Sequence, residues 1–269
     1  MESEAGVITR DVYGPPRLIL ARRGARSDLG AAYAPPAGAH LTSPPRWSPG
    51  IGPGEREEYL DLVLGGDDAA VAAYVRELRA KGVDVSAIYL GLLAPTAERL
   101  GTMWEEDECD FFDVTAATGR LQRAVRELGH EFVGAAPARG DAGRVLLSAM
   151  PGEQHTLGLF MVAEYLLRDG WSVRVLTPAT SAELAGVMRE HAVDVVGFSA
   201  ACDARLLALR HEISAVRRHS RNPHVCVLVG GRIFVEHPDL VGRVGADGFA
   251  ASAADASRCA RALVAAHPD

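Results

Sequence analysis

Cysteine is scarce in this sequence and never closely paired. The 269 residues include four cysteines at widely separated positions, and no Cys-x-x-Cys pair occurs. Structural zinc sites and disulfide frameworks need close or numerous cysteines, so this spacing argues against both. We therefore expect reduced thiols, as in a cytosolic protein, at Cys109, Cys202, Cys226 and Cys259.

Long apolar runs and a secretory signal are also missing. No stretch reaches the roughly 18 apolar residues that a membrane helix requires. The first residues, MESEAG, contain neither the basic nor the apolar region of a signal peptide. The formal net charge of −7 gives no general attraction to nucleic acid or to anionic lipid. The sequence thus predicts a soluble cytoplasmic protein with no membrane association and no autonomous DNA binding.

Proline is concentrated at the start of the chain. Residues 1–53 hold eight of the fifteen prolines, including three Pro-Pro pairs. Proline has no backbone N–H and interrupts helices and strands, so we expect this segment to be mostly disordered. A short apolar run at residues 18–20, beside three arginines, leaves a second interpretation open, namely a docking segment for a partner.

Residues 54–135 have the apolar period of helices. One helix is predicted from the spacing of Val71, Val75 and Leu78, which would lie on one helical face. Further along, apolar residues recur in alternating steps of four and three, which is typical of a helix packed in a bundle. We predict a small bundle of four helices over this range.

The period changes again after a small-residue linker near residues 137–143. Short runs rich in valine and leucine alternate with amphipathic segments of helical length, which predicts βαβ units and a parallel sheet buried on both faces. Residues 143–269 should therefore form a doubly wound, flavodoxin-like α/β domain with five strands. The predicted strands are 145–149, 172–176, 194–199, 225–229 and, more weakly, 248–251.

The loop after the first predicted strand carries the strongest candidate site. In doubly wound sheets, ligands bind beyond the carboxyl ends of the strands, near the point where the strand order reverses. His155 lies in this loop, and a neutral imidazole is a good ligand for a transition metal. Glu153 is placed to accept a hydrogen bond from the other ring nitrogen, which would fix the tautomer. Gly158 removes a side chain at the start of the next helix, which leaves room for a bulky group.

These residues resemble the cobalamin-binding signature D/E-x-H-x-x-G, in which histidine replaces the cofactor's own base as the lower cobalt ligand. The signature continues with a serine at the end of the third strand and a Gly-Gly after the fourth, matched here by Ser199 and by Gly230 and Gly231. The resemblance implies that the serine meets the displaced base and that the glycines make room for the nucleotide tail. One position departs from the pattern, because Ala201 stands where leucine is common.

The helical segment adds to this resemblance. Cobalamin proteins of the methionine-synthase and photoreceptor types carry a four-helix bundle before the sheet, and that bundle caps the upper face of the corrin. Trp104, near the end of the third predicted helix, resembles the tryptophan that covers the upper axial group in the photoreceptors. The alternative interpretation is that Trp104 is only a core aromatic of the bundle.

The combination of both motifs resembles the AerR/PpaA family, regulators of photosynthesis genes in purple bacteria, over about residues 55–265. This resemblance implies a light-responsive protein that binds adenosylcobalamin or hydroxocobalamin and relieves repression by a PpsR/CrtJ-type repressor. It also implies that the chain is not an enzyme. The resemblance is carried by the stretches at residues 104–115, 119–122, 151–159, 161–164 and 245–247.

Three other protein classes are alternatives to this interpretation. A CarH-type repressor is disfavoured, because its Glu-His pair is replaced by Val114 and Thr115 and residues 1–53 cannot form its DNA-binding module. A corrinoid carrier for a methyltransferase or mutase shares the same sheet and bundle, so the fold does not exclude it. A flavin-binding or receiver module without cobalamin is the third alternative.

Overall fold

The computed structural model describes residues 50–134, 142–150, 156–177, 179–200 and 203–266. Of the segment predicted to be mostly disordered, residues 1–53, only residues 50–53 are described; there Ile51 is buried and Pro53 already begins a helix, so the predicted boundary lies a few residues too late. The site residues Glu153 and His155 fall outside the described ranges, as does Ala201. The chain divides between residues 135 and 136 into a helical unit and a sheet unit. Each unit is described by itself.

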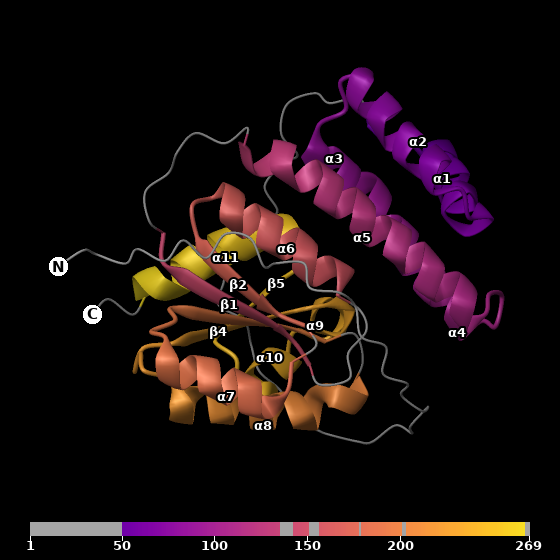
Figure 1. The fold of residues 1–269 in the computed structure, drawn as a ribbon. Coiled ribbons are helices and arrows are strands. Elements are labelled where there is room, and N and C mark those ends of the chain that lie inside the picture. Colours follow the sequence, from indigo (N-terminus) through magenta and orange to yellow (C-terminus); the bar gives the residue numbers. More distant parts are fainter. Residues whose placement is uncertain (1–49, 135–141, 151–155, 178, 201–202, 267–269) are drawn as a thin grey trace. The chain divides into compact units, whose positions relative to one another are not determined.

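The helical unit is a bundle of four helical segments, as the sequence predicts (Figure 1). Its third segment is continuous but changes type along its length, from α-helix to π-helix and back to α-helix. The elements are α1 (Pro53–Gly65), α2 (Asp68–Ala80), α3 (Val85–Ile88), the π-helix η1 (Tyr89–Leu93), α4 (Ala94–Glu105) and α5 (Phe111–Gly134).

Pro95 explains the π-helical turn in the third segment. Proline has no N–H to donate to a carbonyl one turn earlier, and its ring crowds that turn. The chain widens locally, and the Ala94 N–H donates to the carbonyl of Tyr89, five residues back. The carbonyl of Gly91 accepts a hydrogen bond from the Arg56 Nε at 2.8 Å. The Arg56 side chain of α1 thus donates the hydrogen bond that the Gly91 carbonyl would otherwise receive from the N–H of residue 95, which proline lacks.

The core of the helical unit lies along one face of α5. Buried residues on this helix recur at helical spacing, so that one stripe of α5 faces the other helices. Tyr89 packs edge-to-face on Phe132 with ring centroids 5.2 Å apart, and its hydroxyl donates to the Val125 carbonyl at 3.1 Å. The side chains buried most deeply include Tyr59, Val63, Leu92, Leu93, Leu100 and Leu121.

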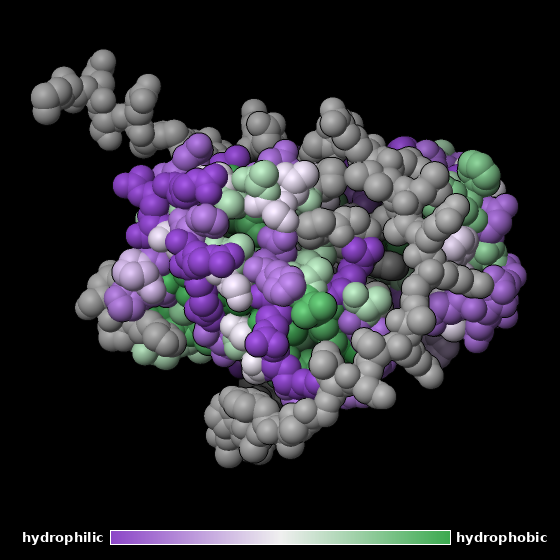
Figure 2. All heavy atoms as spheres, turned by 90° about the horizontal axis from the view of Figure 1, so that it is seen from below, coloured by the Kyte–Doolittle hydropathy of each residue, from purple (hydrophilic) through white to green (hydrophobic). Residues whose placement is uncertain are grey.

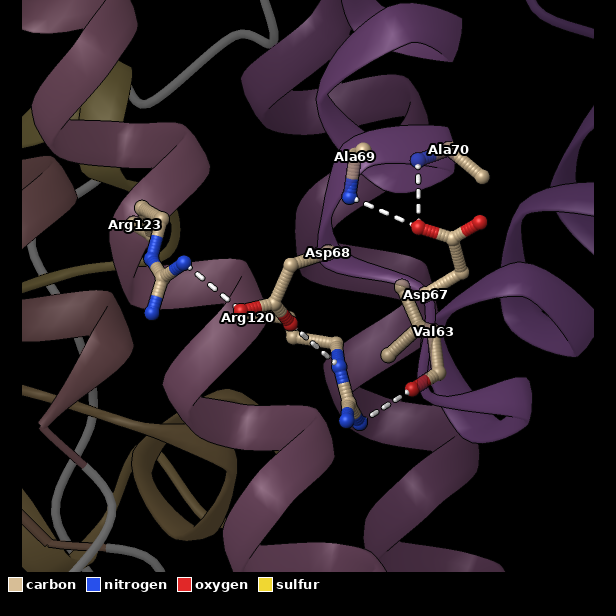
Figure 3. Close-up of polar contacts among 7 residues, drawn as sticks. All are labelled: Val63, Asp67, Asp68, Ala69, Ala70, Arg120 and Arg123. Atoms are coloured by element: carbon tan, nitrogen blue, oxygen red, sulfur yellow. Dashed lines mark hydrogen bonds and ion pairs between the residues drawn. The ribbon is translucent and has the colours of Figure 1, made fainter.

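A polar network holds the start of α2 against α5 (Figure 3). Asp67 caps α2, because its carboxylate accepts hydrogen bonds from the Ala69 and Ala70 amides at 2.9 and 3.1 Å. The neighbouring Asp68 pairs with Arg120 at 2.9 Å and with Arg123 at 2.7 Å. Hydrogen bonding to Arg120 is the main reason why the pKa of Asp68 lies below its usual value. These contacts tie two helices that are far apart in the sequence.

The sheet unit is a doubly wound parallel sheet with the strand order β2-β1-β3-β4-β5. This confirms the predicted flavodoxin-like fold, including the weak fifth strand. The strands are β1 (Arg144–Ala149), β2 (Ser172–Leu176), β3 (Val195–Ser199), β4 (Cys226–Gly230) and β5 (Gly248–Ala250). The helices between and after them are α6 (Leu157–Arg168), α7 (Ser181–Glu190), η2 (Asp203–Arg205), α8 (Leu206–His219), α9 (Arg232–Glu236), α10 (Leu240–Val244) and α11 (Ala253–Ala266).

Helices cover both faces of the sheet, with α6 and α11 on one side and α7 and α8 on the other (Figure 1). Strand residues alternate between the two cores, as the period of two requires. In β1, Val145 and Leu147 pack in the core that includes Leu159 of α6, while Leu146 packs in the core that includes Leu209 of α8. Burial of each such side chain contributes about 1.5–3 kcal/mol. Within the described ranges, no helix is both long and apolar enough to cross a membrane.

Candidate functional site

The carboxyl ends of β1, β3 and β4 form one continuous edge of the sheet. In the strand register, Ala149 pairs with Ser199, and Ser199 pairs with Gly230. The strand order reverses between β1 and β3, so the loop after β1 leaves the sheet at the switch point. The structure thus brings together Ser199, Gly230 and the end of β1, after which the predicted metal ligand follows in the sequence.

The predicted ligand His155 and its predicted partner Glu153 lie outside the described residues, but both ends of their loop are described. Met150 follows β1 and is 1% exposed, and Thr156 precedes α6 and is 8% exposed. The loop is therefore anchored in the core at each end, beside the switch point. No group of three or more metal-ligating side chains occurs in the ranges that the structure describes.

Gly158 presents an open surface in the first turn of α6. It is exposed, whereas its neighbours Leu157 and Leu159 are buried. A Cβ atom at this position would have no heavy atom of the described chain within 4 Å. Glycine costs a helix about 1 kcal/mol relative to alanine, and the chain's own packing supplies no reason for it here. An open glycine at this edge fits the close approach of a bulky ligand.

Ser199 offers a polar group on the same edge. Its side chain is partly buried at the end of β3, and the described part of the chain gives its hydroxyl no hydrogen-bond partner. A hydroxyl has one donor and two acceptor sites, so Ser199 can donate a hydrogen bond to a polar ligand or accept one from it. This fits the predicted contact with a nucleotide base.

Gly230, the last residue of β4, and Gly231, the residue after it, differ in the space around their Cα atoms. Gly231 has φ +111°, and a Cβ atom there would lie 2.1 Å from the carbonyl oxygen of Ala200. Gly230 would meet only an ordinary contact, 3.6 Å from the Ala250 carbonyl oxygen. The Ala200 amide also donates to the Gly230 carbonyl at 3.0 Å. Gly231 is therefore required by the chain's own backbone, which sequence reasoning, having assigned it to the nucleotide tail, did not foresee.

Trp104 lies in the last turn of α4 and is 43% exposed, so the interpretation of it as a core aromatic is wrong. Its ring packs edge-to-face on Phe111, with centroids 6.4 Å apart, and Phe111 in turn contacts the ring of Phe112. Phe112 is 79% exposed, and sequence reasoning missed it as a surface aromatic. The signal for it is the pair of phenylalanines directly after an acidic run, at the start of a helix.

An acidic turn connects α4 to α5 beside these aromatics. Arg99 of α4 pairs with Glu106 at 3.3 Å and with Glu108 at 2.8 Å. The turn places Asp107 at φ +57°, a left-handed conformation that aspartate tolerates better than most residues. Burial and the neighbouring carboxylates raise the pKa of the Cys109 thiol, which disfavours its reactive thiolate form.

Comparisons with known proteins identify the class of this chain. Residues 143–258 match the family described as B12 binding domain. Residues 55–128 match a second family, which is also described as B12 binding domain. The chain is therefore a B12-binding domain protein, and its cofactor class is cobalamin or a related corrinoid.

Individual relatives lie at some distance. An uncharacterized 20.5 kDa protein from the bchF-crtJ intergenic region of Rhodobacter capsulatus is 28% identical over 171 residues, which are 64% of this chain and 88% of that protein. A corrinoid protein of Desulfitobacterium hafniense (strain Y51) is 25% identical over 219 residues, which are 77% and 96% of the two chains. The Methanosarcina barkeri monomethylamine corrinoid protein has the same fold, with a TM-score of 0.67 and 18% identity over 78% of this chain and 98% of its own.

Proposed function

We propose that this chain is a cobalamin-dependent regulator that acts as an antirepressor of a PpsR/CrtJ-type repressor of photosynthesis genes. The observation that carries this proposal is the similarity to the protein from the bchF-crtJ intergenic region, in a chain with two B12-binding matches. The AerR/PpaA resemblance of the sequence supports the same role. We further propose that the chain itself catalyses no reaction.

In this proposal, His155 holds the cobalt from below and Glu153 orients its imidazole. Gly158 admits the corrin next to α6, and the hydroxyl of Ser199 meets the nucleotide base beside Gly230 and Gly231. The open surface at Gly158 and the unpartnered hydroxyl of Ser199 support this assignment.

Trp104 is proposed to cover the upper axial group of the cofactor. Its half-exposed ring, supported by Phe111, is available for such a contact. When bound, an alkylcobalamin supplies a cobalt–carbon bond that visible light breaks. Loss of the upper group would change what Trp104 packs against, and this difference in contacts is what can shift the helical unit between two states.

Absorption spectroscopy of the purified chain tests the cofactor assignment. The protein is incubated with adenosylcobalamin or hydroxocobalamin, freed of excess, and measured in the dark and after illumination. We expect a base-off, histidine-ligated spectrum that is lost in His155→Ala and kept in His237→Ala, an exposed histidine as control. An unchanged spectrum in His155→Ala would remove the proposed cobalt ligand.

A corrinoid carrier for methyl transfer is the second candidate, because the Desulfitobacterium corrinoid protein is matched over 96% of its length. Two assays separate the candidates. Light-dependent binding of a purified PpsR/CrtJ-type repressor, seen as release of that repressor from its operator, supports the regulator. Turnover of methylcobalamin on the chain with a corrinoid methyltransferase supports the carrier and contradicts the regulator if repressor binding is absent.

A further inference from the structure

Helix α8 presents a basic stripe on its outer surface. Leu207, Arg210, Ser214 and Arg218 are spaced three to four residues apart, so they lie along one side of the helix. All four are exposed, and Leu207 is 62% exposed. The stripe therefore combines an apolar side chain with two guanidinium groups.

The helix supplies no carboxylate to neutralise this stripe. Its single acidic residue, Glu212, is 9% exposed and accepts a hydrogen bond from the Ser181 hydroxyl of α7. Neither Arg210 nor Arg218 has a carboxylate three or four residues away, and the described residues give neither an ion pair. Arg217 of the same helix is different, because it bonds Asp247 at 2.8 Å and the Gly245 carbonyl at 3.0 Å.

The basic surface extends to the end of α7. The Arg221 amide donates to the Met188 carbonyl, and the Arg221 guanidinium donates to the Glu190 carbonyl, each at 3.1 Å. These bonds hold the end of α7 beside the segment after α8, and Arg189, the residue between Met188 and Glu190, is also exposed. Glu190 is exposed as well and carries one negative charge on this part of the surface.

We call Leu207, Arg189, Arg210, Arg218 and Arg221 the α8 basic face. Figure 2 views the sheet unit from the side of α7 and α8 and shows mainly hydrophilic side chains there, with smaller apolar patches between them.

Fold stability explains only part of this surface. Arg218 lies in the last turn of α8, where a cation interacts favourably with the helix dipole. Arg210 lies in the second turn, where the helix dipole offers a cation no such stabilisation. Four guanidinium groups on one surface also repel one another. The fold itself therefore gives no reason for Arg210 or for the exposed Leu207.

We propose that the α8 basic face binds an acidic, amphipathic helical segment of a partner protein. Guanidinium groups pair with carboxylates through two parallel hydrogen bonds, and Leu207 offers an apolar anchor at the end of the stripe. A protein segment fits better than nucleic acid, because phosphates gain nothing from an exposed leucine and the whole chain has a net charge of −7. This surface goes beyond cofactor binding and gives a regulator a place to meet its partner.

A binding assay with the full chain, loaded with cobalamin, tests this surface. The probe is a fluorescein-labelled helical peptide of about 18 residues, five turns, with glutamate and leucine along one face. We expect salt-sensitive binding that weakens about 10-fold in R210E/R218E, since two ion pairs of up to about 0.7 kcal/mol each are lost. R76E reverses an exposed arginine of α2 as a control and should change affinity less than about 2-fold.

Leu207→Ala separates the possible occupants. A protein segment should lose affinity about 3-fold, roughly 0.7 kcal/mol, through the missing apolar contact. Tighter binding of a duplex of about 20 base pairs than of the peptide would overturn the proposal in favour of nucleic acid. Self-association that R210E/R218E abolishes, without peptide binding, would assign the face to a second copy. Binding of neither probe would also overturn it. The variants should keep the cobalamin spectrum, which separates this proposal from the cofactor assignment.

Discussion

The helical unit and the sheet unit differ first in charge. Residues 53–134 carry seventeen Asp and Glu against eight Lys and Arg, whereas residues 142–266 carry twelve against thirteen. The negative charge of the chain is thus a property of the helical unit, while the sheet unit is nearly neutral and gathers arginines on α8. The net charge of the whole chain does not show this difference between the units, so it gave no indication of the α8 basic face.

The units also differ in what holds their key features in place. In the helical unit, polar side chains connect the helices, as in the pairing of Asp68 with Arg120 and the hydrogen bond from Arg56 to the Gly91 carbonyl. In the sheet unit, backbone contacts position the candidate site residues. Strand register places Ser199 beside Gly230, and the backbone of Ala200 packs on Gly231. Side-chain contacts can be removed one at a time, but a backbone contact cannot be removed without moving strands.

The largest effect is expected at Gly231. Gly231→Ala would place a methyl group 2.1 Å from the Ala200 carbonyl oxygen, at a backbone conformation that alanine rarely adopts. Strain and clash together should lower the free energy of unfolding of the sheet unit by about 4 kcal/mol. Urea unfolding measures this loss.

Gly158→Ala is the matched control for Gly231→Ala. Its Cβ atom has open space among the described residues, so alanine should stabilise α6 by about 0.5–1 kcal/mol. The same change should lower cobalamin affinity if the corrin approaches this glycine. Equal loss of stability in both variants would contradict the distinction between the two glycines.

Leu121→Ala should have the next largest effect, confined to the helical unit. The side chain is 0% exposed, and its truncation should cost about 3 kcal/mol. Hydrogen exchange read by mass spectrometry should show faster opening in α1, α4 and α5 and unchanged protection in β1 and β3. Thr115→Ala, exposed on α5, is the control. Equal loss of protection in the sheet would show that the two units unfold together.

Asp67→Ala should cost less, about 1 kcal/mol, because it removes the cap of α2. Two amides at the start of the helix lose their acceptor (Figure 3). Asp67→Asn keeps an oxygen acceptor and should recover most of the stability, measured as the urea midpoint. If asparagine fails to recover it, the charge and not the cap is what matters.

The smallest effect concerns Asp68 and pH. Its pKa is lowered in the folded chain, chiefly by the hydrogen bond with Arg120. The folded state thus binds this proton less readily than the unfolded state does, and the stabilisation is present above the usual pKa of aspartate. It is lost as pH falls below about 4, through the lower pKa of the folded state. Asp68→Asn should flatten this part of the stability curve in acid, and a curve identical to that of the parent would contradict the assignment.

The fold could be predicted largely because the sequence contains two kinds of apolar pattern, the helical period in the first unit and short strand-length runs in the second. The strand at Ser172–Leu176 occurs where its apolar run predicts it, and the buried stripe of α5 follows the predicted spacing. The π-helical turn at Pro95 was not predicted, and the hydrogen bond from Arg56 to the Gly91 carbonyl, 35 residues away in sequence, has no signal in a local pattern. The short helices α9 and α10 carry too few turns for a periodic signal.

The candidate site, too, has features that the sequence predicted and features that it did not. The sequence by itself determined the cofactor class and the edge of the sheet to look at, since ligands of doubly wound sheets bind beyond the carboxyl ends of the strands. The cobalt ligand His155 stays a prediction. Only the tertiary structure showed that the Ala200 backbone leaves no room for a side chain at Gly231, whereas no described atom lies near Gly158. It also showed that Trp104 is not a core residue. It also joined Arg221 to the carbonyls of Met188 and Glu190 at the end of α7. Periodicity reports which side of an element is buried, but what a side chain meets depends on elements far away in sequence, and that is settled only when they pack.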